Sequence, residues 1–201
     1  MNRATVLYIG VLLTVVASFG GLVFMASLQL RDLQPVTDAQ GNAMPQNPAG
    51  GVLGGRELYV GLGCLYCHSQ QVRPPGFGAD IQRGWGSRRT VARDYIFDYP
   101  VLLGTMRTGP DLSNIGVRQP SDNWHYLHLY DPQITSPGSI MPPFAFLFAR
   151  RPVEMQRPED ALKFPPDLQD PSTAVVPTLQ ARMLVGYLKS LNSSYKVPEV
   201  Q

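Results

Sequence analysis

Cysteine and histidine are scarce in this 201-residue chain, which contains two cysteines and three histidines. Cys64, Cys67 and His68 form one short C-x-x-C-H motif, and His125 and His128 lie far downstream without a second cysteine pair. A structural zinc site usually needs about four cysteine or histidine ligands, so the composition disfavours zinc. A thioredoxin-like redox pair is also disfavoured, because no βαβ pattern surrounds the motif.

Other absences narrow the class of protein further. The formal net charge is only +2 and no basic patch is interleaved with aromatic residues, so we expect no nucleic-acid partner. The nineteen prolines and nineteen glycines follow no period, which disfavours collagen-like and solenoid folds. They predict long, turn-rich connections within a single domain.

Charged residues are missing between Ala4 and Leu30. The 24 residues from Thr5 to Leu28 would extend roughly 36 Å as a helix, enough to cross a lipid bilayer. The apolar part of a signal peptide usually has about 7 to 15 residues and ends at small residues of the A-x-A type, which are absent here. The sequence therefore predicts an uncleaved transmembrane anchor over residues 1–30. Small residues that favour close helix packing share one face of this helix: Gly10, Thr14, Ala17, Ser18 and Gly21.

The rest of the chain divides by composition. Residues 31–54 are polar, contain glycine and proline, and predict a linker. Residues 55–201 predict the folded domain. Within it, residues 149–177 contain six prolines and no visible period, and they predict an extended arm over the domain or against a partner.

The C-x-x-C-H motif itself indicates a cofactor. A short amphipathic helix with leucines at helical spacing precedes it, from Arg56 onward. Two thiols at this spacing can form thioethers with the vinyl groups of a porphyrin, and the adjacent imidazole can bind the iron. The motif predicts one heme c, bound covalently through Cys64 and Cys67, with His68 as an iron ligand.

The identity of the second iron ligand is open from the residues alone. Met141 lies in "PGSIMPPF", where glycine and prolines stiffen an extended loop, and it is our preferred candidate. A methionine ligand favours electron transfer at raised potential. The alternatives are the other downstream methionines and the two remaining histidines: Met106, Met155, Met183, His125 and His128.

Several blocks resemble a known family. "GRELYVGLGCLYCH", "RTGPDLSNIG" and "ARMLVGYLKSL" resemble the heme-motif helix, the histidine-side loop and the last helix of class I cytochromes c. "CHSQQVRP", "RTGPDL", "SDNWHYLHLYDP" and "SIMPPF", in this order behind one apolar span, resemble the mono-heme subunit of cbb-type (C-family) heme-copper cytochrome c oxidases. The resemblance implies an all-α class I cytochrome c domain with long irregular loops, tethered by one transmembrane helix.

The resemblance also implies roles for single residues. It implies Met141 as the second iron ligand, and the Pro110 carbonyl as acceptor of a hydrogen bond from His68 Nδ1. Arg73 and Arg107 lie inside family-like blocks and are candidates to pair with the heme propionates, for which guanidinium groups are well suited. Most of the other five arginines between residues 73 and 118 are expected to be surface residues. The aromatic residues Tyr59 and Tyr187 are expected where the first and last helices of the domain cross.

Some positions depart from the family pattern. Tyr99, Leu103 and Met106 stand where histidine, tryptophan and lysine are usual, and Asp131-Pro132-Gln133 stands where Asn-Pro-Arg is usual. None of these residues is an expected heme ligand. These departures would instead alter the surface that docks on the partner, so the partner could be a divergent oxidase or a related respiratory complex.

The resemblance implies an electron-relay subunit of a terminal oxidase, with no catalysis of its own. Its partners would be the integral-membrane catalytic subunit and a further c-type cytochrome subunit or a soluble electron donor. A freestanding membrane-anchored carrier is the alternative. Arg3 precedes the span, while Arg31 is balanced by Asp32, which weakly favours a cytoplasmic N-terminus. Since heme c is attached outside the cytoplasm, we expect the domain on the periplasmic or outer face of a bacterial inner membrane.

Overall fold

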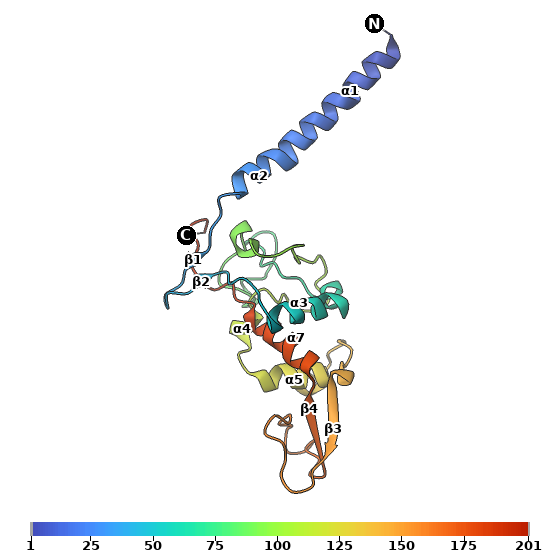
Figure 1. Cartoon of the computed structure of the whole chain (residues 1–201), viewed down its shortest axis with the longest axis vertical. Helices are drawn as coiled ribbons and strands as arrows, with labels where there is room; N and C mark the ends of the chain where they lie inside the picture. Colours follow the sequence, from blue (N-terminus) through green and yellow to red (C-terminus); the bar gives the residue numbers. More distant parts are fainter. Residues whose placement is uncertain (1, 201) are drawn as a thin grey trace. The chain divides into compact units, whose positions relative to one another are not determined.

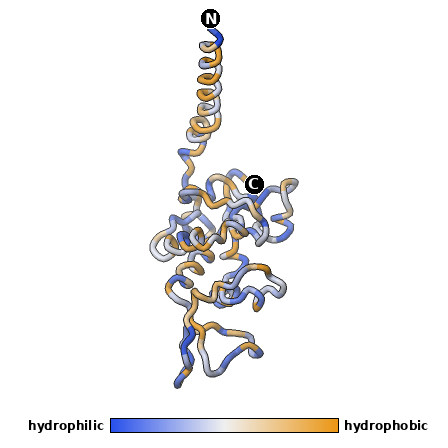
Figure 2. The backbone as a smooth tube through the Cα atoms, turned by 90° about the vertical axis from the view of Figure 1, so that its right-hand side faces the viewer, coloured by the Kyte–Doolittle hydropathy of each residue, from blue (hydrophilic) through white to orange (hydrophobic). Residues whose placement is uncertain are grey.

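A computed structural model describes residues 2–200, which form two compact units divided between Pro35 and Val36. The first unit is helical: α1 (Arg3–Ser18), a π-helical segment (Phe19–Phe24) and α2 (Met25–Leu30) follow one another without a break (Figure 1). None of the residues in these helices is buried, and most of them are apolar (Figure 2). The helix has 28 residues and contains an 18-residue window with a mean hydropathy of 2.3, so it is long and apolar enough to span a membrane.

Two crossed helices form the centre of the second unit: α3 (Gly51–Gly61) and α7 (Leu179–Ser190) (Figure 1). They approach closely at Gly55, where a Cβ would lie 2.8 Å from the Cβ of Tyr187 and closer still to the α7 backbone. The buried rings of Tyr59 and Tyr187 pack against each other with centroids 5.5 Å apart. The predicted aromatic contact between the first and last helices of the domain is confirmed.

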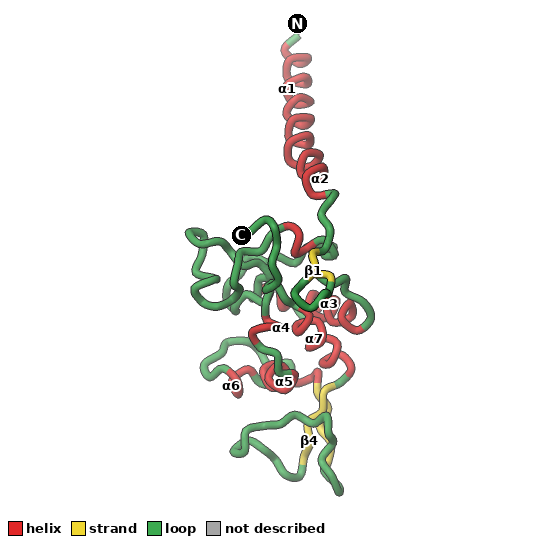
Figure 3. Tube along the Cα trace, turned by 90° about the vertical axis from the view of Figure 1, so that its left-hand side faces the viewer, coloured by secondary structure: helices red, strands yellow, loops and turns green. Residues whose placement is uncertain are grey.

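The other helices are short, and loops make up much of this unit (Figure 3). The α-helices are α4 (Ile115–Arg118), α5 (Asp122–Tyr130) and α6 (Pro132–Thr135), and 3₁₀ turns cover Cys64–Tyr66, Ala92–Tyr95 and Ala145–Leu147. Ser121 begins α5 by accepting a hydrogen bond from the Trp124 amide, and Asp131 caps α6 in the same way, with proline in the first turn. Leucines from α5 and α7 pack into one core with Tyr59.

Two small antiparallel sheets correct the expectation of an all-α fold. β1 (Val36–Thr37) pairs with β2 (Ala43–Met44) inside the predicted linker, and β3 (Phe148–Pro152) pairs with β4 (Thr173–Pro177). The segment 149–177, expected to be an extended arm without regular structure, is therefore a hairpin with a long loop. Its pairing is stabilised by tertiary packing: Phe148 contacts Tyr126 and Tyr130 edge-on, and β4 is buried along Ala174–Pro177.

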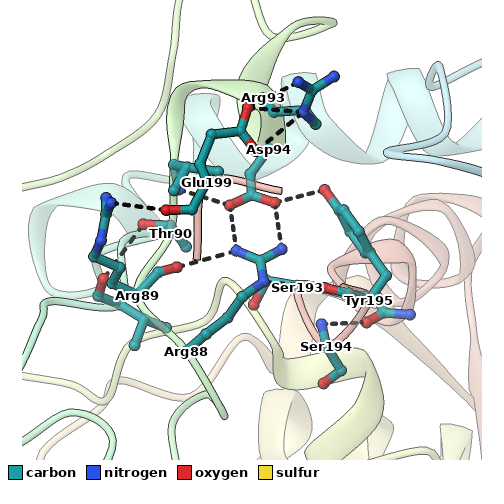
Figure 4. A network of polar contacts seen from close by, with 12 residues as sticks. Arg88, Arg89, Thr90, Arg93, Asp94, Ser193, Ser194, Tyr195 and Glu199 are labelled. Atoms are coloured by element: carbon teal, nitrogen blue, oxygen red, sulfur yellow. Dashed lines mark hydrogen bonds and ion pairs between the residues drawn. The ribbon is translucent and has the colours of Figure 1, made fainter. Parts of the chain in front are cut away.

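The C-terminal segment is tied to the segment 88–95 by a polar network in which Arg88 and Tyr195 are buried. We call this network the C-terminal clasp: Arg88, Arg93, Asp94, Tyr195 and Glu199 (Figure 4). The Arg88 guanidinium donates two hydrogen bonds of 2.8 Å to the Asp94 carboxylate, and the Tyr195 hydroxyl donates a third of 2.6 Å. Arg93 pairs with Glu199 at 2.8 Å. Met44 from β2 packs beside the clasp, so the last residues of the chain and β2 are fixed to the same loop.

Candidate functional site

A cavity of about 620 Å³ lies within the second unit, in the size range of small-molecule and cofactor sites. Its walls come from α3, the C-x-x-C-H segment, the 108–119 segment, α5, the 136–144 loop and α7. Most of the lining is apolar, including Leu62, Leu112, Leu129, Leu184 and Leu188. The cavity is therefore built by segments that are far apart in the sequence.

The C-x-x-C-H segment forms one wall. Helix α3 ends at Gly61, Gly63 adopts a left-handed conformation with φ of 75°, and a 3₁₀ turn then begins at Cys64. Cys64, Cys67 and His68 all line the cavity. Burial raises the pKa of the Cys64 thiol to about 11, the opposite of what a reactive redox cysteine needs.

His68 is held in a fixed orientation. Its Nδ1 donates a hydrogen bond to the carbonyl oxygen of Pro110, 2.7 Å away, which leaves Nε2 with a free lone pair. Burial lowers the pKa of His68, against the opposing effect of this hydrogen bond, so the neutral imidazole is favoured. Gly109 lies against the ring: a Cβ there would be 2.6 Å from Nδ1.

Met141 lines the same cavity, from the loop between α6 and β3. This loop is fixed by Gln133, whose amide nitrogen donates to the Ser139 carbonyl at 2.6 Å and whose amide oxygen accepts from the Gly138 amide at 2.9 Å. Ser139 Oγ in turn accepts from the Met141 amide at 3.2 Å. Gln133, one of the departures from the family pattern, therefore supports the loop that carries Met141.

Most of the other candidate iron ligands lie outside the cavity. Among the methionines of residues 2–200, only Met141 lines the cavity; Met106 and Met155 are exposed. His125 is buried, and its Nε2 donates a hydrogen bond to the Gln119 carbonyl oxygen, 2.8 Å away. His128, which the sequence left open as an alternative ligand, also lines the cavity.

His128 is a neutral cavity residue. Its ring stacks on Trp124 with centroids 4.8 Å apart, and Nδ1 lies 2.5 Å from Thr135 Oγ1. Burial, with smaller contributions from His68 and His125, lowers its pKa to about 4.

The arginines are arranged differently from the expectation. Arg73 and Arg107 are not among the cavity-lining residues. Arg107 donates to Asp80 at 2.7 Å and to the Gln71 carbonyl at 2.8 Å. Arg118, from the end of α4, does line the cavity, and within residues 2–200 its buried Nε has no hydrogen-bond partner. Its place eight residues after Pro110, in the "GPDLSNIGVR" block, was the available indication.

This donor set fits a heme. Two thiols, a neutral imidazole and a thioether sulfur line one largely apolar cavity, together with a guanidinium whose buried Nε lacks a partner. Imidazole and thioether are heme-iron ligands, and a C-x-x-C-H motif attaches heme covalently. In the described residues, no three His, Cys, Asp or Glu side chains form a group that could hold a metal ion. The residues that line this cavity are of the kinds that a heme protein of the cytochrome c type would use.

The comparison with known families makes this specific. The family model described as "Cytochrome C oxidase, mono-heme subunit/FixO" matches residues 1–175, and the chain belongs to this family. No curated protein matches the chain. The family implies one heme and a catalytic membrane subunit as partner. Helix α7 lies beyond the matched residues, although it supplies Leu184 and Leu188 to the cavity.

Proposed function

We propose that this chain relays single electrons as the mono-heme subunit of a cbb-type heme-copper oxidase. It would carry one heme c, bound through Cys64 and Cys67, with His68 and Met141 as the two iron ligands. The observation that carries the proposal is that all four side chains line one cavity. The heme, when bound, supplies a one-electron couple between ferric and ferrous iron.

The chain's own residues prepare this site. Pro110 orients His68 and leaves Nε2 free for a metal. Gln133 holds the loop of Met141, and the leucines of the cavity provide an apolar lining for the bound group. Arg118 is the guanidinium best placed to pair with a carboxylate of the bound group, and we propose it for this role ahead of Arg73 and Arg107. The domain would have the class I cytochrome c fold, with the β3–β4 hairpin as an addition.

The ligand assignment is tested by matched methionine variants. In the oxidised full-length protein, Met141→Ala should abolish the near-infrared sulfur-to-iron charge-transfer band and lower the reduction potential, because a neutral thioether favours ferrous iron more than its replacements do. Met106→Ala is the control, since Met106 is exposed and outside the cavity. Heme should stay covalently bound in both. Loss of the band in Met106→Ala and its retention in Met141→Ala would contradict the assignment.

Assembly and topology are tested separately. Purification in mild detergent should recover the chain with an integral-membrane catalytic subunit; recovery as a lone 22.2 kDa species would favour the freestanding carrier. With a cytoplasmic N-terminus, protease added to spheroplasts should cut the heme domain on the periplasmic side. Cleavage of the domain only after lysis would overturn this orientation.

A further inference from the structure

A buried carboxylate, Asp111, lies directly after Pro110, and its side chain is 0% exposed. Oδ2 accepts hydrogen bonds from Ser69 Oγ at 2.6 Å and from the Gln71 amide at 2.7 Å. Oδ1 accepts from the Ser113 amide at 2.9 Å and from the Ser113 hydroxyl. Because both oxygens accept in every one of these contacts, the arrangement suits the ionised carboxylate.

Asp111 joins the two segments that form the His68–Pro110 hydrogen bond. Ser69 and Gln71 follow the histidine, and Asp111 follows the proline. Two backbone hydrogen bonds also link these segments. The Gly109 amide donates to the Cys67 carbonyl at 2.9 Å, and the Leu112 amide donates to the Ser69 carbonyl at 2.8 Å. The carboxylate thus helps to fix the distance between the imidazole and its acceptor.

The charges around Asp111 are balanced. Arg107 Nη1 lies 3.5 Å from Asp111 Oδ2, and the same guanidinium pairs with Asp80. Arg118 Nη2 donates to the backbone carbonyl of Asp111 at 2.6 Å. Two carboxylates and two guanidiniums therefore lie together beside the His68 segment. Neutralising Asp111 would leave one uncompensated positive charge in a buried region, where charges interact strongly.

We propose that Asp111 is a positioning residue that lowers the reduction potential of the heme. The inference rests on the proposed heme site. Its negative charge favours ferric over ferrous iron, and its contacts keep the His68–Pro110 hydrogen bond short, which strengthens the imidazole as a donor to ferric iron. Replacing Asp111 by a neutral residue weakens both effects, and both changes raise the potential.

The test compares isosteric variants of the full-length protein in detergent, each titrated spectroelectrochemically. Asp111→Asn should raise the potential so that the one-electron equilibrium with a fixed mediator shifts at least tenfold, about 59 mV. Asp80→Asn is the matched control: it removes a carboxylate from the same cluster, but one bonded to the Arg73 amide rather than to the His68 segment. It should shift the equilibrium clearly less.

The remaining outcomes are also decisive. An unchanged potential in a low-spin Asp111→Asn protein, or equal shifts in both variants, would overturn the proposal. If Asp111→Asn does not fold, Arg107→Gln removes a positive charge from the same cluster instead. The reduction potential of the heme should then fall, and a rise or no change would overturn the proposal. Absence of a low-spin heme in the unmodified protein would instead refute the heme site itself.

Discussion

Replacing Gly109 by alanine tests the geometry of the His68 pocket most directly. A Cβ at this position would lie 2.6 Å from Nδ1 and 2.7 Å from Nε2 of His68, whereas real Cβ atoms keep about 3.0 Å or more. The ring cannot simply withdraw, because Nδ1 is bonded to Pro110 and the Gly109 amide is bonded to Cys67. Overpacking costs about 1–3 kcal/mol and a lost hydrogen bond about 1 kcal/mol.

Overpacking and the lost hydrogen bond together predict that Gly109→Ala destabilises the protein by about 2–4 kcal/mol. This loss would lower the melting temperature by roughly 4–16 °C for a chain of this size. The visible spectrum should also lose its low-spin features, since displacing the imidazole by several tenths of an ångström weakens its bond to iron. Circular dichroism melting and absorption spectra measure both effects. Gly186→Ala is the control, because a Cβ there meets nothing within 4 Å and alanine favours the helix. A Gly109→Ala protein with an unaltered spectrum and melting temperature would refute the reasoning.

Three further predictions concern stability. Gly55→Ala should separate α3 from α7 and lower the melting temperature sharply, whereas Gly61→Ala, in the same helix with open space around it, should be tolerated. The pKa of His128 is lowered to about 4 by burial, so its contribution to stability is complete above about pH 6.5 and is lost as the pH falls towards 4; His128→Phe should flatten this part of a pH–melting curve. Asp94→Ala should cost about 3–5 kcal/mol in chemical denaturation, because it leaves the buried Arg88 unpaired; a loss below about 1 kcal/mol would show that the clasp is dispensable.

The cysteine motif and the preferred methionine could be predicted from the sequence because they depend on local patterns. The spacing of Cys64, Cys67 and His68 lies within five residues, and Met141 lies in a loop whose prolines and glycine mark it as rigid. The transmembrane helix depends only on a long apolar run. Such features can be predicted without knowing which distant segments of the chain contact one another.

The missed features all depend on distant contacts. Arg107 is not among the cavity-lining residues, and it pairs with Asp80, 27 residues earlier in the chain; the sequence does not show this pairing. The strands β3 and β4 are separated by a long loop, and "FARRP" has no alternation of apolar and polar residues. The sheet that the all-α expectation omitted is thus specified by packing on the α5 aromatics rather than by its own sequence.

The crossing of α3 and α7 also has a consequence for the order of assembly. Helix α3 ends at Gly61, just before the cysteines, but α7 begins only at Leu179. Because the chain is synthesised from its N-terminus, the cysteine motif exists long before the last wall of the cavity does. Any group attached there early would stay open to water until α7 docks, and closure by such a non-local contact is intrinsically slow. A chain truncated before Leu179 could therefore still acquire its cofactor, but it could not enclose it.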